Sequence, residues 1–344
     1  MSGAAAPRRL LVTGGLGFIG SNFIRTVLAE RAGWSVVNLD ACTYAGNPAN
    51  LADLEGRAGY RFVRGDIADT AAVARALEGC DAVVNFAAET HVDRSILSAA
   101  PFVRTNVVGT LTLLDAVRAR AGCRMLQVST DEVYGALGPA DPPFTESTPL
   151  DPTSPYAASK AAADHLALAY ARTYGTDVVV TRCSNNYGPY QFPEKLIPLM
   201  ITNAVEGAPL PVYGDGQQVR DWIHVEDHCA GLLAALERGV AGEVYNFGGR
   251  SERPNLEIVR RIIALVGADA ALLTHVADRP AHDRRYAVDP AKAERVLGWR
   301  ARHDLASGLE RTVAWYRTHE AWWRAVKSGA YRDFYRTWYE ERTA

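Results

Sequence analysis

The stretch VTGGLGFIG, residues 12–20, decides the fold of this chain. Three of its glycines stand at positions 14, 17 and 20, where an apolar run, Arg9–Thr13, gives way to a segment of helical character, Phe18–Arg31. Glycine lets the backbone turn tightly and approach a pyrophosphate, and the N-terminus of a helix favours negative charge. We therefore predict a strand–turn–helix unit that binds a dinucleotide through Gly14, Gly17 and Gly20. The alternative is a plain turn without a ligand.

The same alternation of strand and helix continues through the first half of the chain. Further segments typical of short buried strands are Ser35–Leu39, Tyr60–Val63, Ala82–Phe86, Arg124–Val128 and Asp177–Thr181. Further segments of helical character are Thr70–Leu77, Pro101–Arg120 and Tyr156–Tyr174. Strands alternating with helices, joined by right-handed crossovers, predict an α/β fold with a doubly wound parallel sheet of the Rossmann type.

The second half of the chain loses this alternation after about residue 182. Proline and glycine become frequent there, while the stretch Asp221–Phe247 again reads as helix followed by strand. We predict an NAD-binding domain over residues 1–182, which the chain re-enters at about residues 221–247. A smaller mixed α/β domain for the substrate should occupy most of residues 183–344.

The composition bounds the class of protein. The chain has 344 residues, of which 48% are hydrophobic and 22% charged, and its net charge is −2. A net charge of −2 does not indicate a basic surface that would bind nucleic acid. No apolar run approaches the roughly 20 residues that span a bilayer. The five cysteines are scattered without a CxxC pair, and the N-terminus lacks a secretory signal. We expect a reduced cytoplasmic protein without a metal site.

Two acidic residues follow predicted strands and are candidates for the adenosine end of a cofactor. Asp40 ends the second strand, 20 residues beyond Gly20. A carboxylate there accepts hydrogen bonds from the ribose hydroxyls and repels a 2′-phosphate, which favours NAD over NADP. The alternative for Asp40 is a helix cap or a turn residue. Asp66 could hold the adenine amino group, although an aspartate in a turn is the simpler interpretation.

A possible acid–base site begins with Tyr156 and Lys160, which form Y-x-x-x-K near the start of a predicted helix. This spacing places both side chains on one face of the helix. Lys160 and an oxidised nicotinamide should lower the pKa of Tyr156 from its usual value near 10. A tyrosinate could then take the proton of a sugar hydroxyl while hydride leaves to NAD. The alternative is an ordinary exposed helix face.

The stretch STDEVYG, residues 129–135, places two carboxylates directly after a strand. Adjacent like charges cost free energy unless a site uses them. The alternative is a solvated acidic turn.

Long motifs throughout the chain resemble those of a known protein family. They are GGLGFIGS, TYAGN, NFAAETHVDRSI, TNVVGT, STDEVYG, SPYAASKAAADH, RCSNNYGPYQFPEKLIP, RDWIHVEDH and DRPAHDRRY. Over nearly its whole length the chain resembles the dTDP-glucose 4,6-dehydratases of the extended short-chain dehydrogenase/reductase superfamily. The resemblance implies oxidation at C4 by NAD, loss of water across C5 and C6, and return of the hydride to C6. Such a lyase makes a 4-keto-6-deoxy sugar nucleotide for deoxysugar biosynthesis.

The resemblance also implies roles for individual residues. Thr130 would hydrogen-bond the 4-hydroxyl, Glu132 would remove the C5 proton, and Asp131 would protonate the departing 6-hydroxyl. Elimination of water needs a base and an acid at neighbouring carbons, and the acid must stay protonated to donate. We therefore expect burial and Glu132 to raise the pKa of Asp131. Further cofactor residues would be Phe18, Ile19, Thr43, Ile67, Phe86, Ala87, Ala88, Thr105 and Asn186. Substrate residues would be Thr90, Asn185, Glu194, Lys195, Leu196, Pro211, Tyr213, Arg220, Asn255, Arg279, His282 and Tyr286.

Relatives of this kind pair through two long helices of each subunit. Here these helices would be Pro101–Arg120 and Tyr156–Tyr174, which would build a four-helix bundle in a homodimer. Val103, Val107, Leu111 and Leu114 form an apolar stripe on the first of them. The alternative is that this stripe packs on the sheet.

Three other functions remain open at this stage. The substrate could be UDP-glucose or CDP-glucose, because the residues do not fix the nucleobase. A 4-epimerase or decarboxylase of the same superfamily would share the glycine turn and Y-x-x-x-K, but would lack the Asp-Glu pair. A non-catalytic NAD-sensing or scaffold protein would have no need of Thr130, Asp131, Glu132, Tyr156 and Lys160 together.

Overall fold

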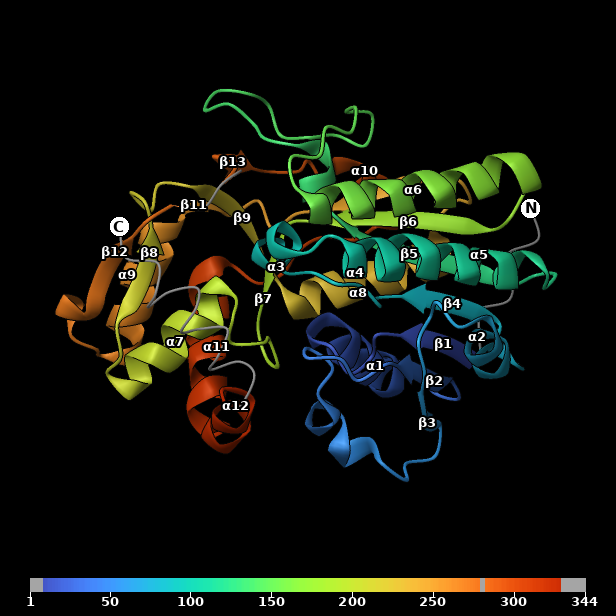
Figure 1. Cartoon of the computed structure of the whole chain (residues 1–344), viewed down its shortest axis with the longest axis horizontal. Helices are drawn as coiled ribbons and strands as arrows, with labels where there is room; N and C mark the ends of the chain where they lie inside the picture. The colour runs from blue at the N-terminus through green and yellow to red at the C-terminus, as the bar shows by residue number, and fades with distance from the viewer. Residues whose placement is uncertain (1–8, 279–281, 329–344) are drawn as a thin grey trace.

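The computed structural model describes residues 9–278 and 282–328 of the chain (Figure 1). Its main feature is a seven-stranded sheet in the order β10-β6-β5-β4-β1-β2-β3, in which every neighbouring pair is parallel. These strands are β1 Arg9–Thr13, β2 Ser35–Asp40, β3 Tyr60–Arg64, β4 Ala82–Asn85, β5 Arg124–Thr130, β6 Val178–Cys183 and β10 Val244–Phe247. The predicted Rossmann sheet is confirmed.

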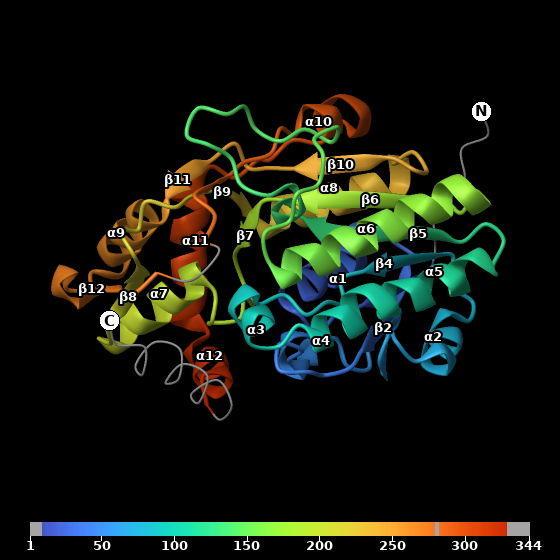
Figure 2. The ribbon, with the colours of Figure 1, turned by 45° about the horizontal axis from the view of Figure 1, so that its top comes forward.

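Apolar side chains cover both faces of this sheet, as a parallel sheet requires. Leu10 and Val12 of β1 pack on one face with α1 Phe18–Glu30 and α8 Val225–Arg238. Leu11, whose side chain points the other way, packs with α2 Thr70–Leu77, α5 Thr110–Arg118 and α6 Pro155–Tyr174. Figure 2 shows α5 and α6 side by side along the sheet. The result is three layers, helix–sheet–helix.

The helix expected over Pro101–Arg120 is continuous but not uniform. It consists of α4 Ala100–Phe102, a π-helical segment η3 Val103–Gly109, and α5. Gly109 lies against Ile67, because a Cβ at this position would come within 2.5 Å of the Ile67 side chain. π-helical turns are frequent at functional sites, and this one carries Thr105. The remaining short elements of the first half are η1 Pro48–Asn50, η2 Ala52–Leu54, α3 Val92–Leu97 and η4 Asp131–Tyr134.

A smaller mixed unit forms the rest of the described chain. It contains two small sheets, one with strands β11-β9-β13 and β7 beside β9, the other with β12 and β8. Its elements are β7 Asn185–Tyr187, α7 Leu196–Glu206, β8 Leu210–Tyr213, β9 Val219–His224, β11 Glu252–Pro254, α9 Asn255–Val266, η5 Ala270–Leu272, β12 Leu273–Val276, β13 Arg285–Tyr286, α11 Leu305–Thr318 and α12 Glu320–Val326. A separate apolar core holds them together.

The chain passes between the two units more than once. Strand β10 pairs with β6 at the edge of the large sheet, and α10 Ala291–Leu297 places Ala293 and Leu297 in the same core as α1 and α8. The division at residue 182 stays a prediction, but residues 291–297 lie against the first unit, outside the predicted re-entry at 221–247. Among the described residues, no helix combines the length and apolarity needed to cross a membrane.

Candidate active site

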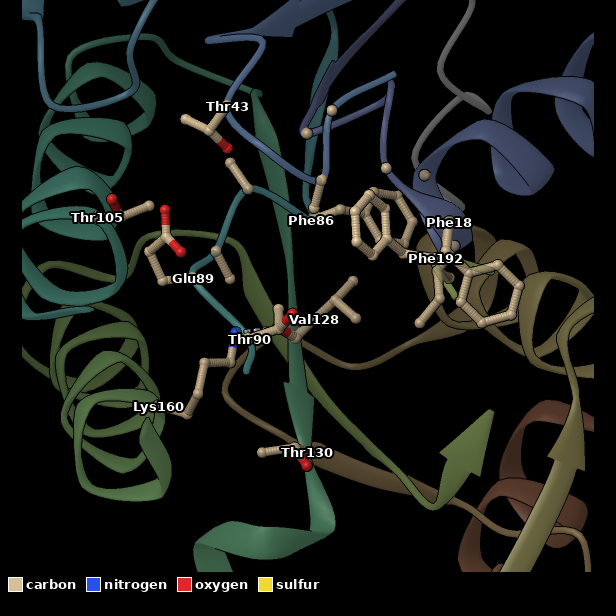
Figure 3. A pocket seen from close by; sticks show the side chains of 18 of the residues that line it. Phe18, Thr43, Phe86, Glu89, Thr90, Thr105, Val128, Thr130, Lys160 and Phe192 are labelled. Carbon is tan, nitrogen blue, oxygen red and sulfur yellow. Dashed lines mark hydrogen bonds between the residues drawn. The ribbon is translucent and has the colours of Figure 1, made fainter. Parts of the chain in front are cut away.

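A cavity of about 330 Å³ lies where the carboxyl ends of the parallel strands meet (Figure 3). The sheet order reverses between β1 and β4, and open α/β sheets bind ligands at such a switch point. All the residues predicted to bind the cofactor line this cavity, as do the five predicted to be catalytic. The tertiary structure therefore brings both sets into one space.

The glycine turn after β1 fits a dinucleotide. Gly14 has φ +68°, and a Cβ there would lie 2.6 Å from the backbone nitrogen of Ala87. Helix α1 begins at Gly17, which provides no side-chain cap, and the first turn carries no acidic residue. The first N–H groups of this helix can therefore bind an anion such as a diphosphate.

Asp40 is held rigidly at the end of β2. Its carboxylate accepts hydrogen bonds from the backbone N–H of Leu16 (2.9 Å) and of Cys42 (2.8 Å). Only 7% of Asp40 is exposed, and burial raises its pKa. Each carboxylate oxygen has a further lone pair, so the group can still accept from a ribose hydroxyl.

Asp66 also lines the cavity, but its two oxygens have partners in the chain. One accepts from the backbone N–H of Ala68 at 2.8 Å, as an aspartate in a turn does, and the other from the Arg104 guanidinium at 2.7 Å. These contacts are those of an aspartate in a turn, which is the simpler interpretation of Asp66. A role toward adenine stays a prediction.

Tyr156 and Lys160 lie in the first turns of α6, which Ser154 caps by accepting a hydrogen bond from the N–H of Ala157. The Lys160 ammonium donates to the carbonyl of Val128 on β5 at 2.7 Å, an arrangement visible in Figure 3. The Thr130 side chain acts on the Tyr156 hydroxyl and favours a lower pKa for it. Both α6 side chains are buried and next to the strand end, so neither belongs to an exposed helix face.

The expected low pKa of Tyr156 includes the charge of an oxidised nicotinamide and stays a prediction, because the residues of the chain together act in the opposite direction. Burial, followed by the charge of Glu132, raises the pKa of Tyr156 well above its usual value. Burial also lowers the pKa of Lys160. Desolvation outweighs the attraction, because both groups lie deep in the protein.

Asp131 and Glu132 stand in the short turn η4 that continues from β5. The Thr130 hydroxyl accepts a hydrogen bond from the backbone N–H of Glu132 at 3.3 Å, which fixes the turn. Asp131 is 2% exposed, and its Oδ2 has no hydrogen-bond partner among the described residues. Burial, followed by the charges of Glu132 and Asp221, raises the pKa of Asp131 well above its usual value. This rise is the one that the sequence predicts.

Part of the predicted substrate set lies at the same cavity. Its lining includes Thr90, Thr130, Asn185, Glu194 and Lys195. The Lys195 ammonium donates to the carbonyl of Thr90 at 3.1 Å, which joins two distant segments of the chain. Burial raises the pKa of Glu194.

The other substrate candidates lie outside the cavity lining, in the smaller unit. They are Leu196, Pro211, Tyr213, Arg220, Asn255, His282 and Tyr286. The Tyr213 and His282 rings meet edge to face at 5.8 Å, and the Arg220 guanidinium lies 4.4 Å from the centre of the Tyr286 ring. The charge of Arg220 acts on Asp131, so this second group adjoins the acid–base pair. Arg279 lies outside the described residues.

Several residues that line the cavity were not predicted from the sequence. They are Leu39, Ala41, Ala45, Gly46, Gly65, Glu89, Val128, Ser129, Cys183, Ser184, Gln191 and Phe192. Most of them adjoin predicted residues inside the same motifs. Their position next to those residues is the sequence signal from which they could have been predicted. Phe192 meets the Tyr44 ring edge to face at 5.8 Å, so the TYAGN and QFPEK segments touch across the cavity rim.

One group of side chains in the described ranges has the composition of a cation site. His224, Glu226 and His303 place their ligand atoms within 4.8 Å of one another. The Arg311 guanidinium already lies 2.8 Å from His303 Nε2 and 3.2 Å from both Glu226 oxygens. Its positive charge opposes a metal ion at this position, and we assign no metal to it.

Comparison with known proteins agrees with this site. Residues 11–312 match the family model described as GDP-mannose 4,6 dehydratase. A dTDP-glucose 4,6-dehydratase of Xanthomonas campestris pv. campestris (strain B100) is 53% identical, with 94% of this chain and 97% of the relative covered. The crystal structure of DesIV, a dTDP-glucose 4,6-dehydratase from Streptomyces venezuelae with NAD bound, has a TM-score of 0.90 and 53% identity, covering 93% of this chain and 100% of that one.

A more distant neighbour represents the epimerase alternative. The UDP-glucose 4-epimerase of Thermotoga maritima has a TM-score of 0.84 but only 28% identity, covering 90% of this chain and 99% of that one. Fold and site together define an extended short-chain dehydrogenase/reductase. Within that class, the chain belongs to the dTDP-glucose 4,6-dehydratase family.

Proposed function

We propose that this chain is a dTDP-glucose 4,6-dehydratase that uses NAD as a bound cofactor and releases dTDP-4-keto-6-deoxyglucose. The observation that carries this proposal is the meeting of the Thr130–Asp131–Glu132 turn with Tyr156 and Lys160 in the cavity of the glycine turn. A dehydratase needs both a dehydrogenase site and a separate acid–base pair, and this cavity has both. A binding module has no need of the second.

The residues of the cavity fit NAD from end to end. The glycine turn and the start of α1 would hold the diphosphate, Asp40 the adenosine ribose, and Asn186 the nicotinamide end. The buried carboxylate of Asp40 would repel a 2′-phosphate, which is why we propose NAD and not NADP. When bound, NAD supplies the oxidation at C4 and the reduction at C6.

Tyr156 and Thr130 would handle the 4-hydroxyl of the sugar. The Thr130 hydroxyl, which acts on Tyr156, can bond the substrate oxygen and hold it beside the tyrosine. Tyr156 then takes the proton as C4 is oxidised. Because burial and nearby carboxylates raise its pKa in the chain itself, its ionisation depends on the positive charge that the cofactor brings.

The carboxylate pair would then eliminate water. Oxidation at C4 acidifies the C5 proton, which Glu132 removes, while Asp131 donates a proton to the departing 6-hydroxyl. The surroundings of the two groups differ in the sense that these roles require, since Asp131 is fully buried and Glu132 only half-buried. Burial raises the pKa of Asp131 and so favours its protonated form, which an acid requires.

A homodimer is the second part of the proposal. Exposed apolar side chains lie on α3, η3 and α6, and we refer to them together as the apolar face: Ile96 at 37%, Leu97 at 66%, Val103 at 50%, Val108 at 45% and Tyr174 at 49% exposure. Leu114 of the predicted stripe is fully buried against the sheet, so the stripe divides between the core and this face. We propose that a second copy covers the face and completes a four-helix bundle.

A cytoplasmic location completes the proposal. A reducing compartment suits a chain with five free cysteines.

The test uses purified protein with dTDP-, UDP- and CDP-glucose in separate reactions. Mass spectrometry measures the loss of one water from each sugar nucleotide, and NMR locates the new ketone. Fastest loss from dTDP-glucose supports the proposal, whereas fastest loss from another nucleotide corrects the nucleobase. An isomer in place of a dehydrated product would favour the epimerase activity, whose support so far is the similarity of fold to an epimerase.

A further inference from the structure

A buried histidine outside the cavity lining contacts one of the cavity residues. His228 lies on α8, is 0% exposed, and places its Nδ1 2.9 Å from the side-chain Oδ1 of Asn186. Asn186 belongs to β7 and lines the cavity, whereas His228 does not. None of the steps above uses this histidine.

The contacts of Asn186 determine which atom of its amide faces the histidine. Its Nδ2 lies 3.0 Å from the carbonyl of Ser184 and 3.3 Å from the Cys183 sulfur. These groups accept hydrogen bonds, so the NH₂ group faces them and the oxygen faces His228. An amide oxygen only accepts, which means that Nδ1 of His228 carries a proton and donates it.

The histidine is a neutral donor with a defined tautomer. Burial lowers the pKa of His228 to about 3, so a single proton remains on the ring and it lies on Nδ1. Its Nε2 is buried and has no hydrogen-bond partner among the described residues. Among the described residues, Asn186 is therefore the one hydrogen-bond partner of this side chain.

The backbone of the same asparagine is fixed from another direction. The Gln191 side chain donates to the carbonyl of Asn186 at 2.9 Å, and the Tyr316 hydroxyl donates to the carbonyl of Gln191 at 2.5 Å. Helix α8 thus restrains the side chain of Asn186, while α11 restrains its main chain through Gln191. Neither restraint involves the sheet that carries the glycine turn.

We propose that His228 is a positioning residue that fixes the Asn186 amide for the nicotinamide end of the cofactor. This inference rests on the proposed function. One lone pair of Asn186 Oδ1 accepts from His228, and the other remains for a donor such as the carboxamide of the nicotinamide. Without His228 the oxygen loses the donor that holds its direction, and the ring loses orientation toward the sugar. Hydride transfer is sensitive to such misplacement.

A matched pair of variants tests this proposal. His228→Leu and His228→Asn have nearly the same shape, but the Asn amide can supply a donor where Nδ1 stood. The NAD released from each denatured protein is measured, followed by NAD titration of enzyme stripped of cofactor. We expect His228→Leu to weaken NAD binding about three- to tenfold, the usual effect of losing one hydrogen bond, and His228→Asn to restore most of it.

A double-mutant cycle shows whether the effect passes through Asn186. After Asn186→Ala, the further change His228→Leu should alter NAD binding little, because the group that it positions is gone. His224→Leu is the control, since His224 is also buried on the neighbouring strand end and has a pKa of about 3. It should lower the melting temperature without changing NAD binding.

The outcomes separate this inference from the proposed function. NAD binding is measured without any sugar, so a failure to dehydrate dTDP-glucose would overturn the function and leave the cycle interpretable. Equal NAD binding by the Leu and Asn variants would overturn the positioning role. So would additive losses in the cycle, because they would show that His228 acts independently of Asn186.

Discussion

At the residue scale, the proposed acid and base are neighbours in the chain with different surroundings. Asp131 is buried beside Asp221, while Glu132 is half-buried and its backbone N–H is tied to Thr130. The two groups share one turn, and burial raises the pKa of Asp131 well above its usual value. The same pattern, two carboxyl groups with distinct environments, assigns acid and base in other enzymes.

Glu132→Gln should abolish the elimination. A glutamine cannot remove the C5 proton, and loss of a general base typically lowers the rate about 10²–10⁴-fold. The measurements are water loss by mass spectrometry and exchange of the C5 proton with deuterated solvent. NAD content serves as the control and should be unchanged. Undiminished exchange would remove Glu132 from the role of base.

Tyr156→Phe should block the step before elimination. Phenylalanine fills the same space between α6 and β5 but cannot take the 4-hydroxyl proton, so C4 is not oxidised. A rapid-mixing experiment with dTDP-glucose would follow the near-ultraviolet absorbance of reduced nicotinamide. We expect no transient from the variant, although it should bind the sugar nucleotide. A normal transient would contradict the assignment.

The raised pKa of Asp131 predicts a cost in stability at neutral pH. Between the usual aspartate pKa and the raised one, the folded chain holds a proton that the unfolded chain has lost. The free energy of unfolding therefore falls as pH rises through this window. Asp131→Asn removes the cost and should raise the melting temperature at pH 7 by about 2 °C or more, while abolishing dehydration.

Calorimetry across pH checks the sign of this effect. The gain from Asp131→Asn should disappear below the usual pKa of aspartate, where both states are protonated. Asp53→Asn is the control, because hydrogen bonding to Arg25 lowers the pKa of Asp53 and its loss should destabilise slightly. A variant at Asp131 that melts lower than the wild type at neutral pH would contradict the argument.

At the element scale, strand–turn–helix geometry explains why the cavity forms at this edge. The turn after β1 must pass within contact distance of the segment after β4, since Gly14 lies against Ala87. Strand β5 runs two residues further than the sequence pattern indicates and delivers Ser129 and Thr130 into the same space. The π-helical segment η3 turns Thr105 toward the cavity from the other side.

Gly14→Ala should disrupt this geometry. The added methyl group would lie 2.6 Å from the Ala87 nitrogen, and φ is +68° at this position, so both contact and conformation are unfavourable. We expect loss of NAD binding and a fall of about 1–3 kcal/mol in the free energy of unfolding. Calorimetry and measurement of bound NAD check both effects.

Gly33→Ala is the matched control for that substitution. Gly33 also has positive φ, +79°, but nothing lies within 4 Å of an added Cβ. In this variant the free energy of unfolding should fall by about 1 kcal/mol because of backbone strain, and NAD binding should be unchanged. Equal loss of NAD from both variants would mean that the close approach to Ala87 is unimportant.

At the scale of the whole molecule, two units and a second copy are proposed to complete the enzyme. The exposed apolar face on α3, η3 and α6 is the surface that a partner copy would cover. Leu97→Asp should yield monomers in light scattering, because a charge buried in an apolar interface is strongly unfavourable. Val240→Asp, at a residue 54% exposed elsewhere, should leave the size unchanged. An unaltered dimer of the Leu97 variant would place the interface on another surface.

The sequence by itself determined the sheet and the glycine turn, and it named the candidates for the acid–base pair. Glycine spacing between a strand and a helix, four-residue spacing on α6 and a carboxylate pair after β5 depend on local geometry, which neighbouring residues dictate. The family motifs supplied further residues, and those in the first half of the chain reached the cavity.

Only the tertiary structure decided the pKa of Tyr156, the neighbours of Asn186 and the place of α10. Each depends on burial and on segments distant in the chain: His228 and Asn186 are 42 residues apart, and Tyr316 and Gln191 are 125 apart. Desolvation and long-range hydrogen bonds arise when separate elements pack together. No local pattern carries that information, because the solvent that a side chain loses is excluded by residues far away in sequence.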